Sequence, residues 1–143
     1  FKGVEHRLEF VRELNGITYI NDSKATNVDS VWYALRSFDK PIYLILGGKD
    51  KGNNYDQIRE LVINNVAKIY AIGSSAQKVY DYFTSIKPVE IKNSLEECVE
   101  TASREAEKNS ILLLSPACAS FDMFQNYEHR GQVFKEAVIK IQI

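Results

Sequence analysis

The chain has 143 residues, the size of one ordinary domain, and its 45% hydrophobic and 26% charged residues are normal for a globular protein. Its formal net charge of −1 gives no electrostatic basis for binding nucleic acid or an anionic membrane surface, and no apolar run is long enough to span a bilayer. We therefore expect a protein with no nucleic-acid partner and no membrane partner.

The first predicted elements form a hairpin. Residues 8–14 alternate loosely between apolar and polar side chains, which is typical of a strand, and residues 17–20 form a second apolar strand. Asn15-Gly16 between them is a two-residue turn, so the two strands should be antiparallel. After a polar loop, apolar side chains recur at helical spacing and predict a helix over 27–38.

The remaining chain alternates strands with helices. Apolar runs predict strands at 42–46, 67–72, 89–91 and 111–114. Four more helices are predicted between or after these strands. The first is capped by Asn54 and carries Ile58, Leu61 and Val62, and the second is capped by Ser74 or Ser75 and carries Val79, Tyr82 and Phe83. The third runs over 95–108 behind a Ser94–Glu97 capping box, and the fourth runs over 130–139. This order predicts an α/β fold with a Rossmann-like, mostly parallel sheet, an antiparallel edge strand and helices on both faces.

The two cysteines, Cys98 and Cys118, are not spaced as a Cys-x-x-Cys pair, and two scattered histidines do not complete a zinc-ligand pattern. We expect two reduced thiols and no metal site. The chain starts at Phe1 rather than at a methionine. We expect it to be a part of a longer protein that folds as a single domain over residues 1–143.

Polar loops follow three of the predicted strands, at 22–27, 47–54 and 115–130. The carboxyl ends of parallel strands meet at one edge of a sheet, and open α/β sheets bind their ligands there. The first loop also contains more polar groups than a helix cap can use. We therefore expect the three loops to converge on a ligand site.

The second and third loops each allow two interpretations. Gly47–Gly52 offers free backbone amides and two lysines that suit a carboxylate or phosphate, but it lacks the Walker pattern and is compatible with a flexible glycine turn. Ser115–Asp122 is rich in small residues, which let a ligand approach the backbone or make a tight crossing capped by Ser120 or Asp122.

Other polar or reactive residues fit structural roles when only their local sequence is considered. Cys118 has no base beside it in the sequence and is expected to be a structural thiol. His6-Arg7 has the character of a surface pair. His129-Arg130 is expected to be structural and to precede the last helix.

Four motifs, in their order and spacing, resemble the carboxyl-terminal domain of the Mur ligases, a family of ATP-dependent amide-forming enzymes of bacterial cell-wall synthesis. The motifs are His6-Arg7-Leu8-Glu9, Asn21 to Asn27, Gly47 to Gly52, and Leu114 to Asp122 with Phe124, Asn126, Glu128, Arg130 and Gly131. The resemblance covers essentially the whole chain. The run from Asp22 to Asn27 resembles the members that add D-glutamate.

The resemblance implies one domain of a three-domain, monomeric ligase in the bacterial cytoplasm, which adds D-glutamate to UDP-N-acetylmuramoyl-L-alanine in peptidoglycan synthesis. It implies that ATP phosphorylates the substrate carboxylate and that the D-glutamate amine attacks the acyl phosphate. An amino-terminal domain would hold the UDP part of the substrate, and a central domain would carry the ATP phosphate loop and the Mg²⁺ ligands. This domain would bring in D-glutamate, close over ATP and be inactive alone.

The resemblance also assigns binding residues for D-glutamate. Thr26, Lys51, Ser120 and Phe121 would hold its carboxylates. Tyr127, where the family often has phenylalanine, would pack beside the amino acid.

A second group of residues would reach ATP across the domain interface. By resemblance these are His6, Arg7 at the phosphates, and Asp22 on the ribose side, while Lys24 would steer anionic substrate groups. Such residues act when domains meet, so we expect replacement of Asp22 or Arg7 to leave the stability of this domain nearly unchanged.

Two other functions are compatible with an α/β domain. One is a stand-alone binding module for a nucleotide or small anion without catalysis, which the sequence preceding Phe1 would distinguish from a ligase. The other is a flavodoxin-like or response-regulator-like signalling domain. It needs a phosphoacceptor aspartate among other acidic residues, and Asp22 lacks such neighbours in the sequence.

Overall fold

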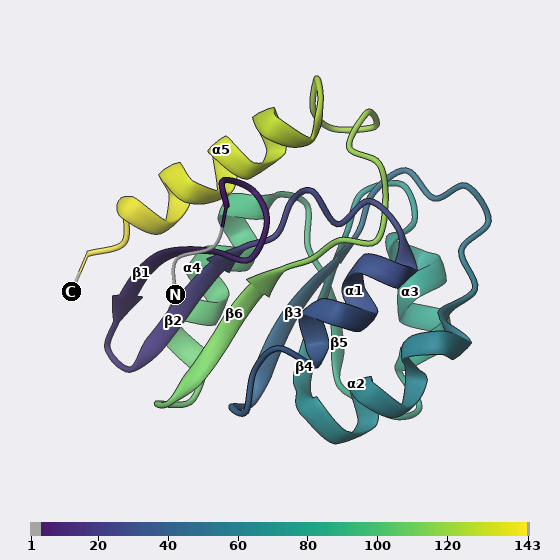
Figure 1. The fold of residues 1–143 in the computed structure, drawn as a ribbon, viewed down its shortest axis with the longest axis horizontal. Coiled ribbons are helices and arrows are strands. Elements are labelled where there is room, and N and C mark those ends of the chain that lie inside the picture. Colours follow the sequence, from purple (N-terminus) through teal and green to yellow (C-terminus); the bar gives the residue numbers. More distant parts are fainter. Residues whose placement is uncertain (1–3, 143) are drawn as a thin grey trace.

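The computed structural model describes residues 4–142, and its centre is one six-stranded sheet with the order β1-β2-β6-β3-β4-β5 (Figure 1). The strands are β1 (Glu9–Leu14), β2 (Ile17–Asn21), β3 (Ile42–Gly47), β4 (Val66–Ile72), β5 (Val89–Ile91) and β6 (Ser110–Leu114). In this sheet β1 and β2 pair antiparallel, and the other neighbouring pairs are parallel. The predicted sheet, with its antiparallel edge strand, is confirmed.

Helices cover both faces of the sheet (Figure 1). They are α1 (Val28–Leu35), the 3-10 helix η1 (Tyr55–Ile58), α2 (Arg59–Asn65), α3 (Ala76–Phe83), α4 (Leu95–Glu105) and α5 (Tyr127–Ile139). Successive side chains of a strand point to opposite faces. Leu44 and Leu46 of β3 therefore belong to the core beneath α1, α2 and α3, whereas Tyr43 and Ile45 belong to the core beneath α4 and α5.

The hairpin turn follows the sequence prediction. Asn15 has a φ of 54° and Gly16 a φ of 81°, and a type I′ turn needs positive φ at both positions. At the other end of the hairpin, Glu9 pairs with Asn21. The segment that precedes β1, with His6 and Arg7, therefore lies at the edge of the sheet where β2 ends.

Two helices end earlier than their sequence patterns predict. The helix expected over 27–38 ends at Leu35, where the Ser37 hydroxyl donates to the Tyr33 carbonyl at 2.8 Å and satisfies it. The helix expected over 95–108 ends at Glu105, because Ala106 takes an extended ψ of 143°. In both cases the apolar spacing extends past the residue at which the backbone leaves the helix.

Helix α5 starts three residues earlier than expected, at Tyr127. The side chain of Asn126 caps it by accepting a hydrogen bond from the His129 backbone N–H at 2.7 Å. His129 and Arg130 therefore lie inside the helix, and the prediction that they precede it is wrong. The cap signal at Asn126 was present in the sequence.

Gly131 in α5 gives a first prediction. A Cβ built at this position lies 2.1 Å from His6 Nδ1, and the imidazole is buried. Helix propensity alone favours alanine over glycine by about 1 kcal/mol. We expect Gly131→Ala instead to lower the free energy of unfolding by about 1–3 kcal/mol, because the added methyl group overpacks the site. Urea unfolding of the variant measures this change.

The matched control is Gln132→Ala, at the exposed neighbouring position of the same helix. It should be neutral or slightly stabilising, since alanine is the better helix former and no neighbour is displaced. A stabilising Gly131→Ala would contradict the packing argument.

Candidate functional site

The three polar loops leave the sheet at the same edge (Figure 1). We name them after the strands they follow: the β2 loop (residues 22–27), the β3 loop (48–54) and the β6 loop (115–126). β2, β6 and β3 are neighbouring parallel strands, so their carboxyl ends lie side by side. The predicted convergence of the loops is confirmed.

Backbone contacts join the loops to one another. Ala117 N in the β6 loop donates to Ala25 O in the β2 loop at 2.9 Å, and Lys49 of the β3 loop pairs with Ala119 in an antiparallel bridge. Gly48 permits this approach, because a Cβ there would lie 2.6 Å from Ala119 O. The loops therefore form one backbone framework rather than three independent turns.

Arg130 of α5 binds two of the loops through hydrogen bonds. Its side chain is 1% exposed, and its Nε donates to Ser23 Oγ at 2.8 Å. Its Nη2 donates to Ser23 O at 2.6 Å and its Nη1 to Cys118 O at 2.8 Å. Burial lowers the pKa of Arg130 to about 10. These contacts agree with the expectation that Arg130 is structural. That Arg130 would connect the β2 loop to the β6 loop was not predicted.

Asp22 is buried at the start of the β2 loop. Its Oδ1 accepts from Leu8 N at 3.1 Å and its Oδ2 from Ser115 Oγ at 2.8 Å. Burial raises the pKa of Asp22 to about 6, although the hydrogen bonds from Ser115 and Leu8 and the charge of Arg7 oppose it. The carboxylate joins three segments, which argues against the expectation that its replacement leaves the stability of this domain nearly unchanged. Lys24 in the same loop is exposed.

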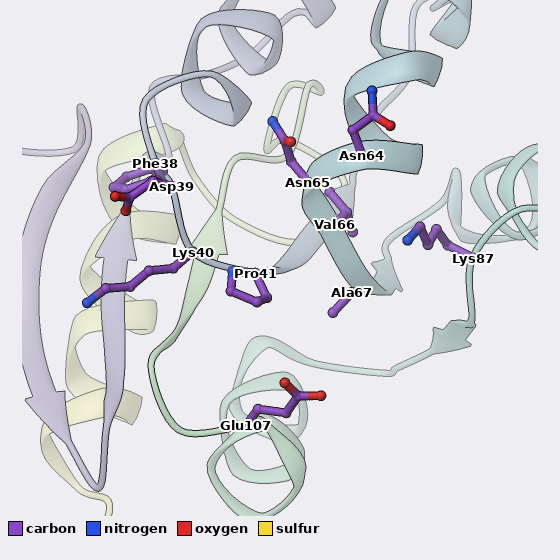
Figure 2. Close-up of a pocket in the computed structure, with 10 residues that line it drawn as sticks. All are labelled: Phe38, Asp39, Lys40, Pro41, Asn64, Asn65, Val66, Ala67, Lys87 and Glu107. Carbon is purple, nitrogen blue, oxygen red and sulfur yellow. The ribbon is translucent and has the colours of Figure 1, made fainter.

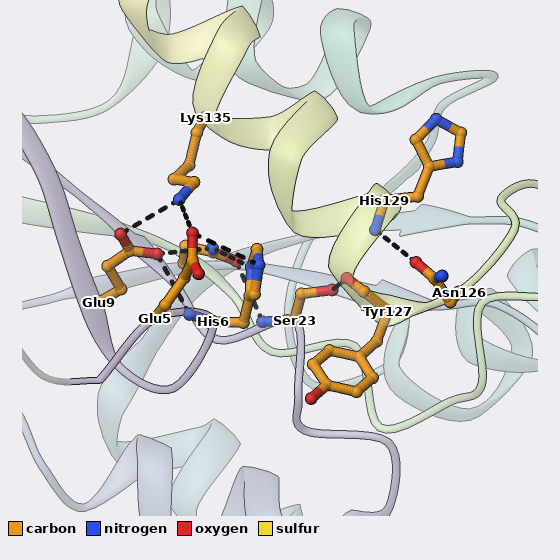
Figure 3. Close-up of polar contacts among 9 residues, drawn as sticks. Glu5, His6, Glu9, Ser23, Asn126, Tyr127, His129 and Lys135 are labelled. Atoms are coloured by element: carbon orange, nitrogen blue, oxygen red, sulfur yellow. Dashed lines mark hydrogen bonds and ion pairs between the residues drawn. The ribbon is translucent and has the colours of Figure 1, made fainter.

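His6 is buried, which contradicts its interpretation as a surface residue, whereas Arg7 is exposed. The imidazole packs edge-on against Tyr127 with ring centres 6.0 Å apart (Figure 3). Asn21 Oδ1 accepts from Ser23 N at 3.1 Å, so its amide nitrogen faces His6 Nδ1 at 2.9 Å. Because that nitrogen is a donor, Nδ1 must accept, and the proton of the neutral ring lies on Nε2.

Two glutamates and a lysine hold the segment around His6 (Figure 3). Lys135 Nζ of α5 lies 2.9 Å from Glu5 Oε2 and 3.3 Å from Glu9 Oε2. The other oxygen of Glu9 accepts from the backbone N–H of His6 at 3.1 Å and from Asn21 Nδ2 at 3.0 Å. This network attaches the segment before β1 to both β2 and α5.

The residues that the resemblance assigns to D-glutamate come from all three loops and the start of α5. Thr26, Lys51 and Phe121 are exposed, and Ser120 is buried at 3% exposure. Tyr127 is half-buried at the first position of α5. All five lie at the loop edge, and their contact with a ligand stays a prediction.

Both cysteines are free and buried, as expected of structural thiols. Cys98 lies on the buried face of α4, and burial raises the pKa of its thiol. Burial also raises the pKa of Cys118, whose sulfur lies 3.8 Å from Ser75 Oγ and 3.9 Å from the Tyr55 hydroxyl. A raised thiol pKa disfavours the nucleophilic thiolate, which agrees with a structural role for Cys118.

Two residues expected to cap helices hold the loops instead. Ser75 stands at the N-cap position of α3, but its hydroxyl accepts from Gly48 N at 3.1 Å in the β3 loop. Asp122 of the β6 loop accepts from Ser74 N at 2.8 Å and does not cap α5. The two contacts join the segment after β4 to the β3 loop and to the β6 loop.

Pockets occur at both ends of the sheet. An open pocket of about 430 Å³ lies at the opposite edge, where Lys40, Lys87 and Glu107 stand on different sides of it (Figure 2). It contains none of the candidate residues. A smaller pocket of about 260 Å³ at the loop edge is lined in part by Asp50 and Lys78.

Within residues 4–142, no group of three or more His, Cys, Asp or Glu could hold a metal ion, and no helix is long and apolar enough to cross a membrane.

Residues 6–118 match the protein family described as "Mur ligase, glutamate ligase domain". The chain belongs to this family. It is 53% identical over 141 residues to the UDP-N-acetylmuramoylalanine–D-glutamate ligase of Chloroherpeton thalassium, an alignment that covers 99% of this chain and 30% of that protein. The chain spans less than a third of the length of the curated relatives it matches.

Solved structures share the fold at low sequence identity. A folylpolyglutamate synthase from Thermotoga maritima superposes with a TM-score of 0.66 at 18% identity, covering 99% of this chain and 32% of that one. The MurF ligase from the same organism, solved in complex with ADP, gives a TM-score of 0.59 at 16% identity and covers 98% of this chain and 33% of its own. These likenesses place the Mur ligase domain described above in a wider group of similar folds.

Asp22 gives a prediction about pH. Its pKa is about 6 in the folded protein and about 3.9 in an unfolded chain. Between these values the folded protein holds a proton that the unfolded chain releases, so this residue lowers stability as pH rises from 4 to 6. Asp22→Asn removes the charge, and its stability relative to wild type should rise by on the order of 2–3 kcal/mol from pH 4 to pH 7.

Chemical unfolding of both proteins across this range tests the prediction. The other carboxylates are common to both chains, so their titration cancels in the difference. A difference that is constant with pH would show that Asp22 titrates normally.

Proposed function

We propose that this chain is the D-glutamate-binding, carboxyl-terminal domain of a three-domain ATP-dependent ligase that joins D-glutamate to UDP-N-acetylmuramoyl-L-alanine in bacterial peptidoglycan synthesis. The observation that carries the proposal is the convergence of the family's motifs on one loop edge, in a chain 53% identical to a protein named as that ligase. The proposal includes a cytoplasmic, monomeric enzyme in which this domain is inactive alone.

The proposed binding of D-glutamate rests on the charge and exposure of the loop residues. D-Glutamate carries two carboxylates, which are best bound by a cation and by N–H or O–H donors. Lys51 is exposed and supplies a positive charge, and Thr26 and Ser120 supply hydroxyls on the neighbouring loops. The half-buried ring of Tyr127 and the exposed ring of Phe121 would cover the apolar part of the ligand. Held by its carboxylates, the amino acid keeps its amine free to attack.

The proposed ATP contacts lie beside this group. Arg7 is exposed and suits phosphate oxygens, and His6 offers an N–H donor at Nε2. Among residues 4–142, each carboxylate oxygen of Asp22 has one hydrogen-bond donor. A carboxylate oxygen accepts more than one hydrogen bond, which leaves capacity for a ribose hydroxyl. The MurF ligase of Thermotoga maritima, which contains a domain of this fold, was solved in complex with ADP, and this supports a nucleotide substrate for a ligase of this kind.

The chemistry of the reaction divides between domains in this proposal. ATP would phosphorylate the carboxylate of UDP-N-acetylmuramoyl-L-alanine, and the amine of D-glutamate would displace phosphate to form the amide. Mg²⁺, when bound by ligands of another domain, would neutralise phosphate charge. The residues of this domain position the amine and contact the nucleotide. A ligand site that positions its substrate can supply a large part of the rate enhancement.

Lys51 provides the main test. In the full-length ligase we expect Lys51→Ala to raise the Michaelis constant for D-glutamate about ten- to a hundred-fold, because a lost charge-assisted contact costs about 1.5–3 kcal/mol. The Michaelis constant for ATP should change far less. Steady-state kinetics with each substrate varied separately measures both.

The matched control is Lys40→Ala, an exposed lysine at the opposite edge of the sheet (Figure 2). It removes the same charge and should leave both Michaelis constants unchanged. An unchanged Michaelis constant for D-glutamate in Lys51→Ala would mean that Lys51 does not bind D-glutamate and is only a solvated lysine on a glycine turn.

The division of labour gives another expected outcome. The purified domain should neither hydrolyse ATP nor form the amide product, because the phosphate loop and the metal ligands are proposed to lie in another domain. Phosphate release and product formation, assayed with all three substrates, measure this. Turnover by the domain alone would reject the proposed arrangement.

A further inference from the structure

The β3 loop makes a sharp turn with Lys51 and Gly52 at its tip. The Oδ1 atom of Asp50, directly before the tip, accepts hydrogen bonds from Gly52 N at 2.7 Å and from Asn53 N at 2.6 Å. Gly52 has a φ of 96°, a left-handed conformation that glycine adopts easily. An aspartate that bonds backbone N–H groups two and three residues ahead is a common way to fix a turn.

The other oxygen of Asp50 is held from outside the loop. The Asp50 side chain is 8% exposed, and its Oδ2 lies 2.7 Å from Lys78 Nζ of α3. This buried oxygen has no further hydrogen-bond partner among residues 4–142. Although burial alone would raise the pKa of Asp50, hydrogen bonds from Asn53, Lys78 and Gly52 keep it below its usual range. The carboxylate is therefore charged and depends on Lys78 for compensation.

Lys78 contacts the loop on both sides of its tip. Besides its ion pair with Asp50, its ammonium donates to the backbone carbonyl of Asn53 at 2.8 Å. It thereby joins the residue before Lys51 to the residue after Gly52. The side chain of Lys78, which comes from α3 and not from the loop, therefore links the two ends of the turn.

Asn53 connects the same turn to the β6 loop. Its Nδ2 donates to Ala117 O at 2.9 Å and to Cys118 Sγ at 3.5 Å. Ser120 follows two residues later in the β6 loop and is buried. The contacts from Asp50 to the β6 loop thus fix the backbone of Lys51 relative to that of Ser120.

We propose that Asp50 and Lys78 are positioning residues for Lys51, whose ion pair closes the turn that presents Lys51 to the D-glutamate carboxylates. The inference rests on the proposed function, in which Lys51 binds D-glutamate. A lysine on a mobile loop would lose more conformational freedom on binding than a lysine on a fixed turn. The ion pair reduces that loss without touching the ligand.

A double-mutant cycle in the full-length ligase tests this inference. Lys78→Met should raise the Michaelis constant for D-glutamate about five- to ten-fold, with a smaller effect on that for ATP. In a Lys51→Ala background the same change should add little, because its effect passes through Lys51. Lys78→Arg keeps the ion pair and should restore most of the affinity.

Two further variants keep the test decisive. Asp50→Asn retains an oxygen for both backbone N–H groups but loses the charge, so it should raise the Michaelis constant for D-glutamate as Lys78→Met does. It replaces Lys78→Met in the test if that variant does not fold. Arg104→Met breaks an exposed ion pair with Glu100 on α4 and should leave the kinetics unchanged. Thermal melts establish that each variant is folded at the assay temperature.

Three outcomes would overturn the inference. An equal increase in both backgrounds would mean that the ion pair acts independently of Lys51, for example by contacting the ligand from the adjoining pocket. An unchanged Michaelis constant in folded Lys78→Met and Asp50→Asn would make the pair purely structural. If Lys51→Ala itself leaves the Michaelis constant for D-glutamate unchanged, the role proposed for Lys51 is wrong, and the positioning inference that rests on it is wrong too. If Lys51→Ala has the expected effect, either of the first two outcomes rejects the positioning inference alone.

Discussion

A buried guanidinium holds the loop edge together. Arg130 has no carboxylate within ion-pair distance in the part of the chain that the structure describes, and it donates instead to Ser23 and to the carbonyl of Cys118. A buried charge is costly unless its donors are satisfied, so these hydrogen bonds require the β2 and β6 loops to keep one relative position. The other contacts of the edge, such as the Lys49–Ala119 bridge, attach to this frame.

Close packing around that frame depends on glycines at two positions. Gly48 lets the β3 loop approach Ala119, and Gly131 leaves room for the buried imidazole of His6. A methyl group at Gly48 would collide with the β6 loop, and one at Gly131 would collide with His6, which a packed interior cannot absorb. The residues proposed to bind ligand, including Lys51, thus stand on a rigid base although several of them are exposed.

The sequence was sufficient for the fold and for the convergence of the three polar loops, because both follow from local patterns. Strand and helix periods gave the element order, and the geometry of parallel strands then required the loops to share an edge. The individual roles of His6, Asp22 and Arg130 were harder to predict. His6 is buried by Asn21, 15 positions away, and by α5 at the far end of the chain. Burial of a polar side chain depends on such distant neighbours, which no local pattern contains.

The sheet order also governs when the domain can form during translation. Strand β6 lies between the β1–β2 hairpin and the unit of β3, β4 and β5, and it pairs with β2 on one side and β3 on the other. It is nevertheless the last strand in the chain. Until Ser110–Leu114 has left the ribosome, the strand that pairs with both β2 and β3 is missing, so each would have an unpaired edge. Such edges favour pairing with other chains. The late central strand therefore makes the completed domain, rather than its growing parts, the unit in which both β2 and β3 have a partner on the side that β6 occupies.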